Sequence, residues 1–231
     1  MKKFLKSELS GWKASELVWM AFVCLVICGL SVYWGDSVWG IISGVTGVLY
    51  TLLTGKGKLS AYGFGLVNCV FYASISFGAK LYGETILNGF YYIPMMFVGF
   101  FAWRRNMDAE TCEVKKRHMT VKGRLLLLVI IASATVIFGL VLRMLGDVMP
   151  FVDSFTTVSS VVAMVVSVKR YSEQWWIWLA VNIFSVYMWW CNFASGNDNI
   201  ATLVMWLVYL LNGIFIMIKW EKELRTVERG E

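Results

Sequence analysis

The sequence contains few of the residues on which soluble proteins depend. Only 16% of its 231 residues are charged, proline occurs twice and histidine once. A soluble domain is about 25% charged. A chain of this length cannot hide a hydrophobic content of 58% in one water-soluble core. With two prolines, 20 glycines and five cysteines, the composition also excludes disordered, collagen-like and disulfide-built chains. The remaining class is the integral membrane protein.

Patterns for catalysis and metal binding are also missing. Four of the five cysteines lie in apolar runs, and no CxxC or Cys/His pattern predicts a zinc site or a disulfide framework. The single histidine, His118, lies with Cys112 in a charged loop. The sequence has no GxSxG or HExxH motif and no close pair of carboxylates in an apolar run. We therefore expect no enzyme, no metal and no cofactor.

Apolar runs of about 20 residues are long enough to cross a membrane as helices. The first run follows basic residues, as a signal peptide would, but it is too long and no small-residue cleavage pattern follows it, so we expect it to be retained. The sequence predicts an all-α integral membrane protein with eight transmembrane helices: Ala14–Trp34, Ser37–Leu53, Ser60–Phe77, Glu84–Trp103, Gly123–Leu145, Val148–Val168, Gln174–Ala194 and Asn199–Lys219.

The basic residues predict the orientation of these helices. If the N-terminus is cytoplasmic, 19 of the 21 lysines and arginines fall in cytoplasmic segments, and only Lys80 and Arg143 fall outside. Both the N- and the C-terminus are therefore expected in the cytoplasm. Loop charges of this kind also account for the net charge of +6, so a nucleic acid partner is not expected.

An internal repeat divides the chain. Asn68 falls on Asn182 at an offset of 114 residues, and Trp103 falls on Trp220 at an offset of 117. Three helices and one linker make an even number, so the copies are parallel. This 3+1+3 plan is that of SWEET-type sugar carriers, an analogy of architecture alone. The expected parts are an N-terminal basic segment with an extra helix (1–35), the first repeat (36–103), a basic cytoplasmic loop (104–122), a linker helix (123–146), the second repeat (147–220) and a cytoplasmic tail (221–231).

Polar and aromatic residues recur at helical spacing inside the predicted spans. Such groups are costly in lipid unless they pair or line a wet cavity. In the span 174–194 they follow one another at three and four residues, which puts them on one face of the helix. The candidate substrate-binding residues are Trp175, Trp178, Asn182, Ser185, Trp189, Tyr209, Asn212, Asn68, Asn88, Tyr92, Asp153 and Gln174.

The residue types indicate the chemistry of a ligand. Aromatic faces stack on flat rings and attract cations, while amides bind carboxamides and sugar hydroxyls. A phosphate or free carboxylate would usually need Arg or Lys, and Arg143 lies only at the end of a span. A neutral or cationic molecule with a flat ring and a sugar is favoured. Purely structural roles stay open, with Asn and Ser bridging helices, Trp189 in an interfacial belt and Asp153 at a helix start.

Two stretches in the second half resemble a known family. Residues 149–154 (MPFVDS) and 169–175 (KRYSEQW), followed by Trp178, Asn182 and Ser185, are similar to the PnuC family of bacterial nicotinamide riboside transporters. Residues 62–68 (YGFGLVN), 81–82 (LY) and 99–103 (GFFAW) fit its first repeat. The sequence departs from the family pattern at Gly89 and Met96, where polar amides are expected.

The resemblance implies a carrier of nicotinamide riboside, a form of vitamin B3 used in NAD biosynthesis, in the bacterial inner membrane. It implies facilitated diffusion through a site between the two repeats, retention by a separate cytoplasmic kinase, and a homotrimer with one path per protomer. Asp153 is the only carboxylate well within a span, so uptake without an ion gradient is expected. The alternatives are a carrier of another neutral or cationic vitamin or a sugar, and a structural membrane protein.

Overall fold

The computed structural model describes residues 7–35, 37–78, 85–146, 149–195 and 200–229. These residues form nine helical segments: α2 (Ala14–Trp34), α3 (Val38–Lys56), α4 (Ala61–Gly78), η1 (Leu87–Tyr92), α6 (Ile93–Arg104), α7 (Val121–Met144), α8 (Pro150–Val168), α9 (Gln174–Ala194) and α10 (Ile200–Arg229). A helix lies at each of the eight predicted positions, with η1 and α6 together in the fourth. Lys80, residues 81–82, the predicted starts Glu84, Val148 and Asn199, and the boundary positions 1, 36, 147 and 231 lie outside the described residues.

Short-range signals in the sequence set the ends of several helices. The Ser37 hydroxyl accepts a hydrogen bond from the Gly40 amide at 3.1 Å, and the Thr120 hydroxyl accepts one from the Gly123 amide at 3.2 Å. Helix α3 ends at Gly57, whose φ of 76° is in the left-handed region that glycine adopts without strain. Helix α10 runs on to Arg229, well past the predicted end of the span at Lys219. The extra turns leave the apolar span and carry charged residues that meet the loop after α6.

The helices have the length and composition of a membrane protein. Helices α2, α3, α7 and α8 and the segment Leu203–Thr226 of α10 are each long and apolar enough to cross a bilayer, and the shorter α4 is apolar as well. Only 6% of the most apolar stretch of α7 is buried against the rest of the protein. A helix so exposed and so apolar is compatible with a lipid environment and not with water. The all-helical membrane fold expected from the composition is thus observed.

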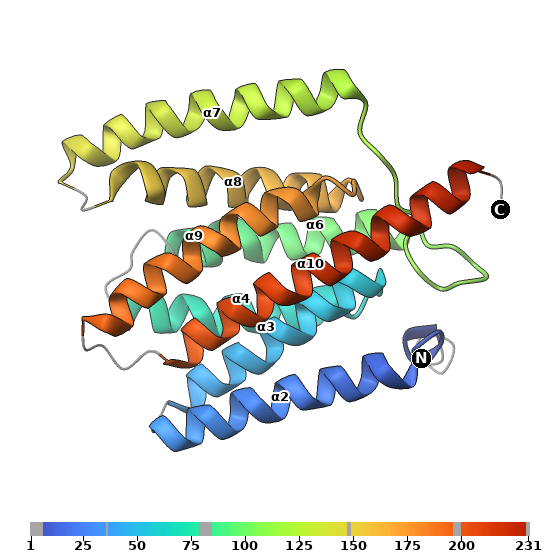
Figure 1. Cartoon of the computed structure of the whole chain (residues 1–231), viewed down its shortest axis with the longest axis horizontal. Coiled ribbons are helices and arrows are strands. Elements are labelled where there is room, and N and C mark those ends of the chain that lie inside the picture. The colour runs from blue at the N-terminus through green and yellow to red at the C-terminus, as the bar shows by residue number, and fades with distance from the viewer. Residues whose placement is uncertain (1–6, 36, 79–84, 147–148, 196–199, 230–231) are drawn as a thin grey trace.

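The helices form one bundle whose two sides are covered differently (Figure 1). Helix α7 lies along one side and packs on α8, while α2 lies along the opposite side and packs on α3 and α10. The other helices lie between them. Helix α2 begins, and helix α10 ends, at the same end of the bundle as the loop of residues 105–120 (Figure 1). We call this end of the bundle the loop end.

The fourth span is interrupted by a π-helical turn. Residues Leu87–Tyr92 are π-helical, and the Ile93 amide donates to the Asn88 carbonyl, five residues earlier. Pro94 follows directly and has no amide hydrogen, so it cannot continue the regular α-helical ladder into the preceding turn. Turns of this kind are rare and often occur at functional sites.

The loop 105–120 is held against both halves of the bundle by backbone hydrogen bonds. The Val114 amide donates to the Gly57 carbonyl at 3.0 Å, in the connection between α3 and α4. The Arg117 amide donates to the Arg170 carbonyl at 3.1 Å, in the connection between α8 and α9. Lys58 is fully buried beside the loop and donates to the carbonyls of Ser7 and Cys112 at 3.0 and 3.1 Å. Burial lowers the pKa of the Lys58 ammonium below its usual value.

Candidate functional site

A cavity lies inside the bundle and encloses about 980 Å³ of space, its mouth included. Seven helical segments contribute to its wall, three from the last half of the chain. The lining residues are Tyr50, Thr51, Thr54, Asn68, Cys69, Tyr72, Leu87, Asn88, Tyr92, Met96, Thr156, Ser160, Met164, Trp175, Trp178, Val181, Asn182, Ser185, Met205, Trp206 and Tyr209.

Helix α9 supplies the most regular part of the wall. Trp175, Trp178, Asn182 and Ser185 all line the cavity, as their spacing of three and four residues predicts for one helix face. The Asn182 side chain is 4% exposed and makes no hydrogen bond with another described residue. The indole nitrogens of Trp175 and Trp206 are buried and also have no hydrogen-bond partner among the described residues. Buried polar groups are normally satisfied, so these groups are available to a ligand.

The first half of the chain forms the opposite wall and is internally paired. The Asn68 amide nitrogen donates to the Ser43 carbonyl at 2.8 Å and to the Ser43 hydroxyl at 3.2 Å, which ties α4 to α3. The Tyr50 hydroxyl lies 3.9 Å from the Met164 sulfur and so joins the two walls. Met96, where the resemblance led us to expect a polar amide, also lines the cavity.

Gly47 makes the close approach of the two walls possible. A Cβ atom at this position would collide with the Tyr209 hydroxyl and would lie 2.7 Å from the Asn68 amide nitrogen. Gly47 thus brings α10 and α4 against the backbone of α3, while a Cβ atom at Gly44, one turn earlier, would lie 3.0 Å from Ile27 of α2.

Eight of the twelve predicted site residues line the cavity: Trp175, Trp178, Asn182, Ser185, Tyr209, Asn68, Asn88 and Tyr92. The other four lie elsewhere. Asn212 turns toward α2, where its carbonyl oxygen accepts a hydrogen bond from the Trp19 indole at 2.8 Å. The Gln174 amide is buried at the start of α9 and donates to the Tyr171 carbonyl at 3.1 Å. Asp153 lies in the first turn of α8, and Trp189 lies one helical turn past Ser185, the last lining residue of α9.

The prediction from the sequence did not include the contribution of α3. Tyr50, Thr51 and Thr54 line the cavity, as do Tyr72 of α4 and Trp206 of α10. The repeat carried a usable signal, because Tyr50 falls on Met164 at the offset of 114 residues and both residues line the cavity. Thr51 and Thr54 continue the stripe of Gly40, Gly44 and Gly47 at spacings of four and three residues, so the same face of α3 reaches the cavity farther along the helix.

The cavity wall carries no formal charge. None of the described residues that line it is a lysine, arginine, aspartate or glutamate. The wall combines aromatic rings, thioethers, hydroxyls and amides, which bind by stacking and by neutral hydrogen bonds. Such a wall suits a planar molecule with polar substituents better than an anion, whose charge would be buried without a partner.

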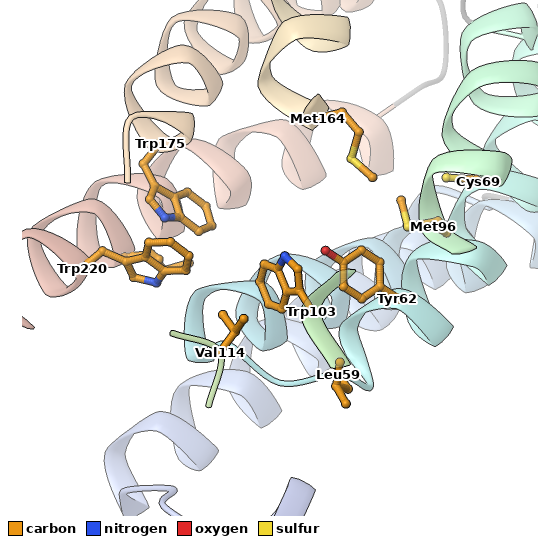
Figure 2. Packing of buried hydrophobic residues seen from close by; sticks show 10 residues of the cluster. Leu59, Tyr62, Cys69, Met96, Trp103, Val114, Met164, Trp175 and Trp220 are labelled. Carbon is orange, nitrogen blue, oxygen red and sulfur yellow. The ribbon is translucent and has the colours of Figure 1, made fainter. Parts of the chain in front are cut away.

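Aromatic side chains pack between the cavity and the loop end. The Trp103 indole of α6 donates to the Ser167 carbonyl of α8 at 3.1 Å, and the Trp220 indole of α10 donates to the Gly55 carbonyl of α3 at 2.8 Å. Figure 2 shows Trp220 beside Trp175 and Trp103 beside Tyr62. The ring centroids of the first pair are 5.7 Å apart and those of the second pair 5.2 Å apart. Trp103 and Trp220 are fully buried.

Comparison with known proteins places this chain in a family. The family model described as nicotinamide mononucleotide transporter matches residues 37–222. A nicotinamide riboside transporter PnuC of Neisseria mucosa is 38% identical over 225 residues, covering 94% of this chain and 85% of that protein. The chain belongs to the PnuC family of nicotinamide riboside transporters. The resemblance noted in the sequence is thereby confirmed.

Other PnuC proteins agree with this assignment. The PnuC protein of Haemophilus influenzae is 34% identical, covering 94% of this chain and 95% of that protein. A solved structure described as the crystal structure of the vitamin B3 transporter PnuC superimposes with a TM-score of 0.87 at 37% identity and covers 96% of this chain and 97% of that one. The chain is therefore a multi-pass membrane protein of a transporter family, and the expectation that it is not an enzyme is confirmed.

Proposed function

We propose that this protein imports nicotinamide riboside by facilitated diffusion through the cavity between its two halves. The observation that carries the proposal is the uncharged aromatic wall around Asn182, whose amide has no hydrogen-bond partner among the described residues. Nicotinamide riboside offers a flat cationic ring, a carboxamide and a ribose. The rings of Trp175 and Trp178 would stack on the cation, and Asn182 would pair with the carboxamide. Ser185, Asn88, Tyr92, Asn68 and Tyr209 also line the cavity, and the ribose would lie among them.

The membrane arrangement is part of the proposal. Eight spans would form an extra N-terminal helix and two parallel repeats of three helices joined by α7. The matched positions Trp103 and Trp220 support the repeat, because each donates its indole hydrogen to the first helix of the other half. The loop end would face the bacterial cytoplasm with both termini, as the distribution of basic residues predicts. Family resemblance supports a homotrimer with one path per protomer.

The phosphate distinguishes the riboside from the mononucleotide named in the description of the family model. A phosphate monoester carries a charge of about −1.5 to −2 near neutral pH. Its recognition usually needs Arg or Lys, and the described residues of the cavity wall include neither. We infer that the riboside is the substrate and that the mononucleotide is rejected.

Competition against labelled nicotinamide riboside in proteoliposomes tests the choice of substrate. The expected order of affinity is riboside, then nicotinamide, then mononucleotide, with the mononucleotide at least roughly 100-fold weaker because its charge is buried without a partner. Nicotinamide is expected to bind more weakly than the riboside because it lacks the ribose and the ring charge. A mononucleotide that competes as well as the riboside contradicts the uncharged site. Thiamine, riboflavin and hexoses in the same assay test the alternative substrates.

The structural alternative is separated from transport by Trp178→Ala. In a carrier this change removes a stacking face and is expected to abolish riboside binding while the purified protein stays monodisperse and helical. In a scaffold it lowers stability alone.

Energy coupling is tested in the same liposomes, where uptake is expected without an imposed ion gradient. Accumulation above the outside concentration that collapses with an uncoupler contradicts facilitated diffusion.

A further inference from the structure

The loop end carries a closed ring of ion pairs. Three glutamates and three lysines alternate around it, and each carboxylate lies within 4 Å of two ammonium groups. In order, the separations are 2.8 Å for Glu16–Lys56, 3.8 Å for Lys56–Glu113, 3.2 Å for Glu113–Lys116, a closer contact for Lys116–Glu223, 3.9 Å for Glu223–Lys219 and 3.3 Å for Lys219–Glu16.

The ring consists of two arcs from different parts of the bundle. Helix α2, helix α3 and the loop contribute one arc, which is Glu16, Lys56, Glu113 and Lys116. Helix α10 contributes the other arc, which is Lys219 and Glu223 at a spacing of four residues. Only two of the six ion pairs, Lys116–Glu223 and Glu16–Lys219, join the arcs. Each arc is neutral and internally paired, so separating α10 from the other arc leaves no charge without a partner.

The ring of ion pairs is connected to the cavity through two aromatic residues, Trp220 and Trp175. The Lys116 ammonium lies 5.2 Å from the centroid of the Trp220 ring, and Trp220 packs edge-on against Trp175 at 5.7 Å. Trp175 lines the cavity. The Lys116 side chain is 8% exposed, so its charge is partly desolvated. Its attraction to the indole of Trp220 is therefore stronger than at an exposed site. Displacement of α10 would therefore move Trp220 away from both Lys116 and the cavity wall.

The surroundings of the ring allow it to open. Five of its six members, all except Lys116, line a hollow at the loop end, so water reaches the charges when the arcs part. Partly exposed ion pairs of this kind are individually weak, but a network that acts as a unit is cooperative. A carrier needs such a contact, because the two halves must separate at one end without unfolding.

We propose that this ring is the latch of the substrate path at the loop end. It holds α10, with Trp220, against the first half of the chain while the cavity is closed on that side, and it opens at two ion pairs to release the substrate. Lys116 is a positioning residue, which acts on the cavity through Trp220 and Trp175. This role rests on the proposed function as a carrier.

The first test measures how readily a thiol reagent reaches the aromatic cluster between the cavity and the ring of ion pairs, and it needs no substrate. Val114 is 2% exposed and packs in the aromatic cluster below the cavity. In a variant whose five native cysteines are replaced, Val114→Cys reports opening by its rate of reaction with a maleimide in detergent. Lys116→Met is expected to raise this rate at least about twofold, the lower end of what couplings in a contact network produce.

Lys115→Met is the matched control for the accessibility test. Lys115 is the neighbouring lysine of the same loop and pairs with Asp108 at 3.6 Å outside the ring. It is expected to leave the rate at the parent value. Equal acceleration by both changes overturns the latch. If Lys116→Met does not fold, Glu223→Gln breaks the same bridge and carries the same expectation.

The second test cross-links the two arcs of the ring. Cysteines in place of Lys116 and Glu223, joined by a short reducible bifunctional thiol reagent, are expected to stop riboside uptake while riboside binding persists, and reduction restores uptake. The same linker between cysteines at Asp108 and Lys115 lies outside the ring and leaves uptake unchanged. Normal uptake by the linked 116–223 protein overturns the latch. Loss of riboside binding in the reduced protein contradicts the proposed function instead, and the accessibility test then still decides the role of the ring.

Discussion

The two walls of the cavity carry the same residue at matched positions and use it differently. Asn68 on α4 spends its amide nitrogen on Ser43 of α3, at 2.8 and 3.2 Å. Asn182 on α9, 114 residues later, hydrogen-bonds no other described residue and lines the cavity, as do Trp175 and Trp178. The comparison teaches that an amide lies on both sides, but the first half uses it for packing. We therefore expect recognition to be concentrated in the second half.

The sharpest test of this difference is the pair Asn182→Ala and Asn68→Ala. Asn182→Ala removes both the donor and the acceptor that would pair with a carboxamide. A loss of two such hydrogen bonds, with the ligand groups left unpaired, costs about 3 kcal/mol, or roughly 100-fold in affinity. Isothermal calorimetry with nicotinamide riboside measures this loss, and the unfolding temperature is expected to stay near that of the parent.

Asn68→Ala is expected to show the reverse pattern. It removes the hydrogen bonds between α4 and α3, which are worth about 1 kcal/mol in a membrane protein. The unfolding temperature is expected to fall by a few degrees, while riboside affinity changes less than for Asn182→Ala. Equal losses of affinity in the two variants would remove the distinction between the walls.

Gly47→Ala tests the contact between the two walls, because the absence of a side chain at Gly47 lets them approach each other. The added methyl group would displace the Tyr209 hydroxyl and the Asn68 amide, which it meets at 2.7 Å. Overpacking of this kind typically costs about 1–3 kcal/mol, so both stability and riboside affinity are expected to fall. Gly63→Ala on α4 is the control, since a Cβ atom there has no neighbour within 4 Å. Thermal unfolding with and without riboside measures both effects, and identical behaviour of the two variants contradicts this role of Gly47.

Trp19→Phe tests whether α2 supports the second wall. It keeps an aromatic ring but loses the indole hydrogen bond to Asn212, three residues beyond Tyr209 on α10. The expected cost is about 1 kcal/mol of stability, with less than a tenfold loss of affinity. Trp39→Phe, at a residue that is 56% exposed, is the control for removing an indole hydrogen. A Trp19→Phe protein as stable as this control would leave α2 without a role at Asn212.

Asp153→Asn is expected to have the smallest effect. Asp153 does not line the cavity, and proposed facilitated diffusion assigns it no proton or ion to carry. Uptake in proteoliposomes is expected to change by less than about twofold, because substitutions away from the cavity have small effects. A tenfold loss, or a new dependence on pH, would give the first turn of α8 a part in the second half of the site.

The sequence predicted the residues of α9 well because periodicity alone decides which face of an isolated helix is polar. Trp175, Trp178, Asn182 and Ser185 all line the cavity, as expected. Asn212 shares the same helical stripe as Tyr209 but lies one turn nearer the loop end, where α2 covers α10. Which neighbour covers each turn of a helix is a property of the packing, and periodicity does not contain it.

The contribution of α3 was missed for a related reason. Glycines at 40, 44 and 47 are a strong signal for close packing, which gave no reason to expect that the same stripe reaches the cavity through Thr51 and Thr54, with Tyr50 beside it. The π-helical turn at Leu87–Tyr92 also had no signal beyond Pro94, although it carries Asn88 and Tyr92 into the cavity wall. The ion-pair ring joins residues from Glu16 to Glu223, and pairing over such separations depends on the fold.

The same long separations dictate an order of assembly. The Glu16 carboxylate and the Lys219 ammonium that meet in the ring are 203 residues apart, so the first partner is synthesised long before the last. Until α10 is in place, Trp220 cannot bond to Gly55. A nascent chain thus becomes fully paired at the loop end only with its final helix, and folding of the N-terminal part alone is incomplete. We expect chains truncated before α10 to be cleaved by protease at the 105–120 loop, where the complete protein resists.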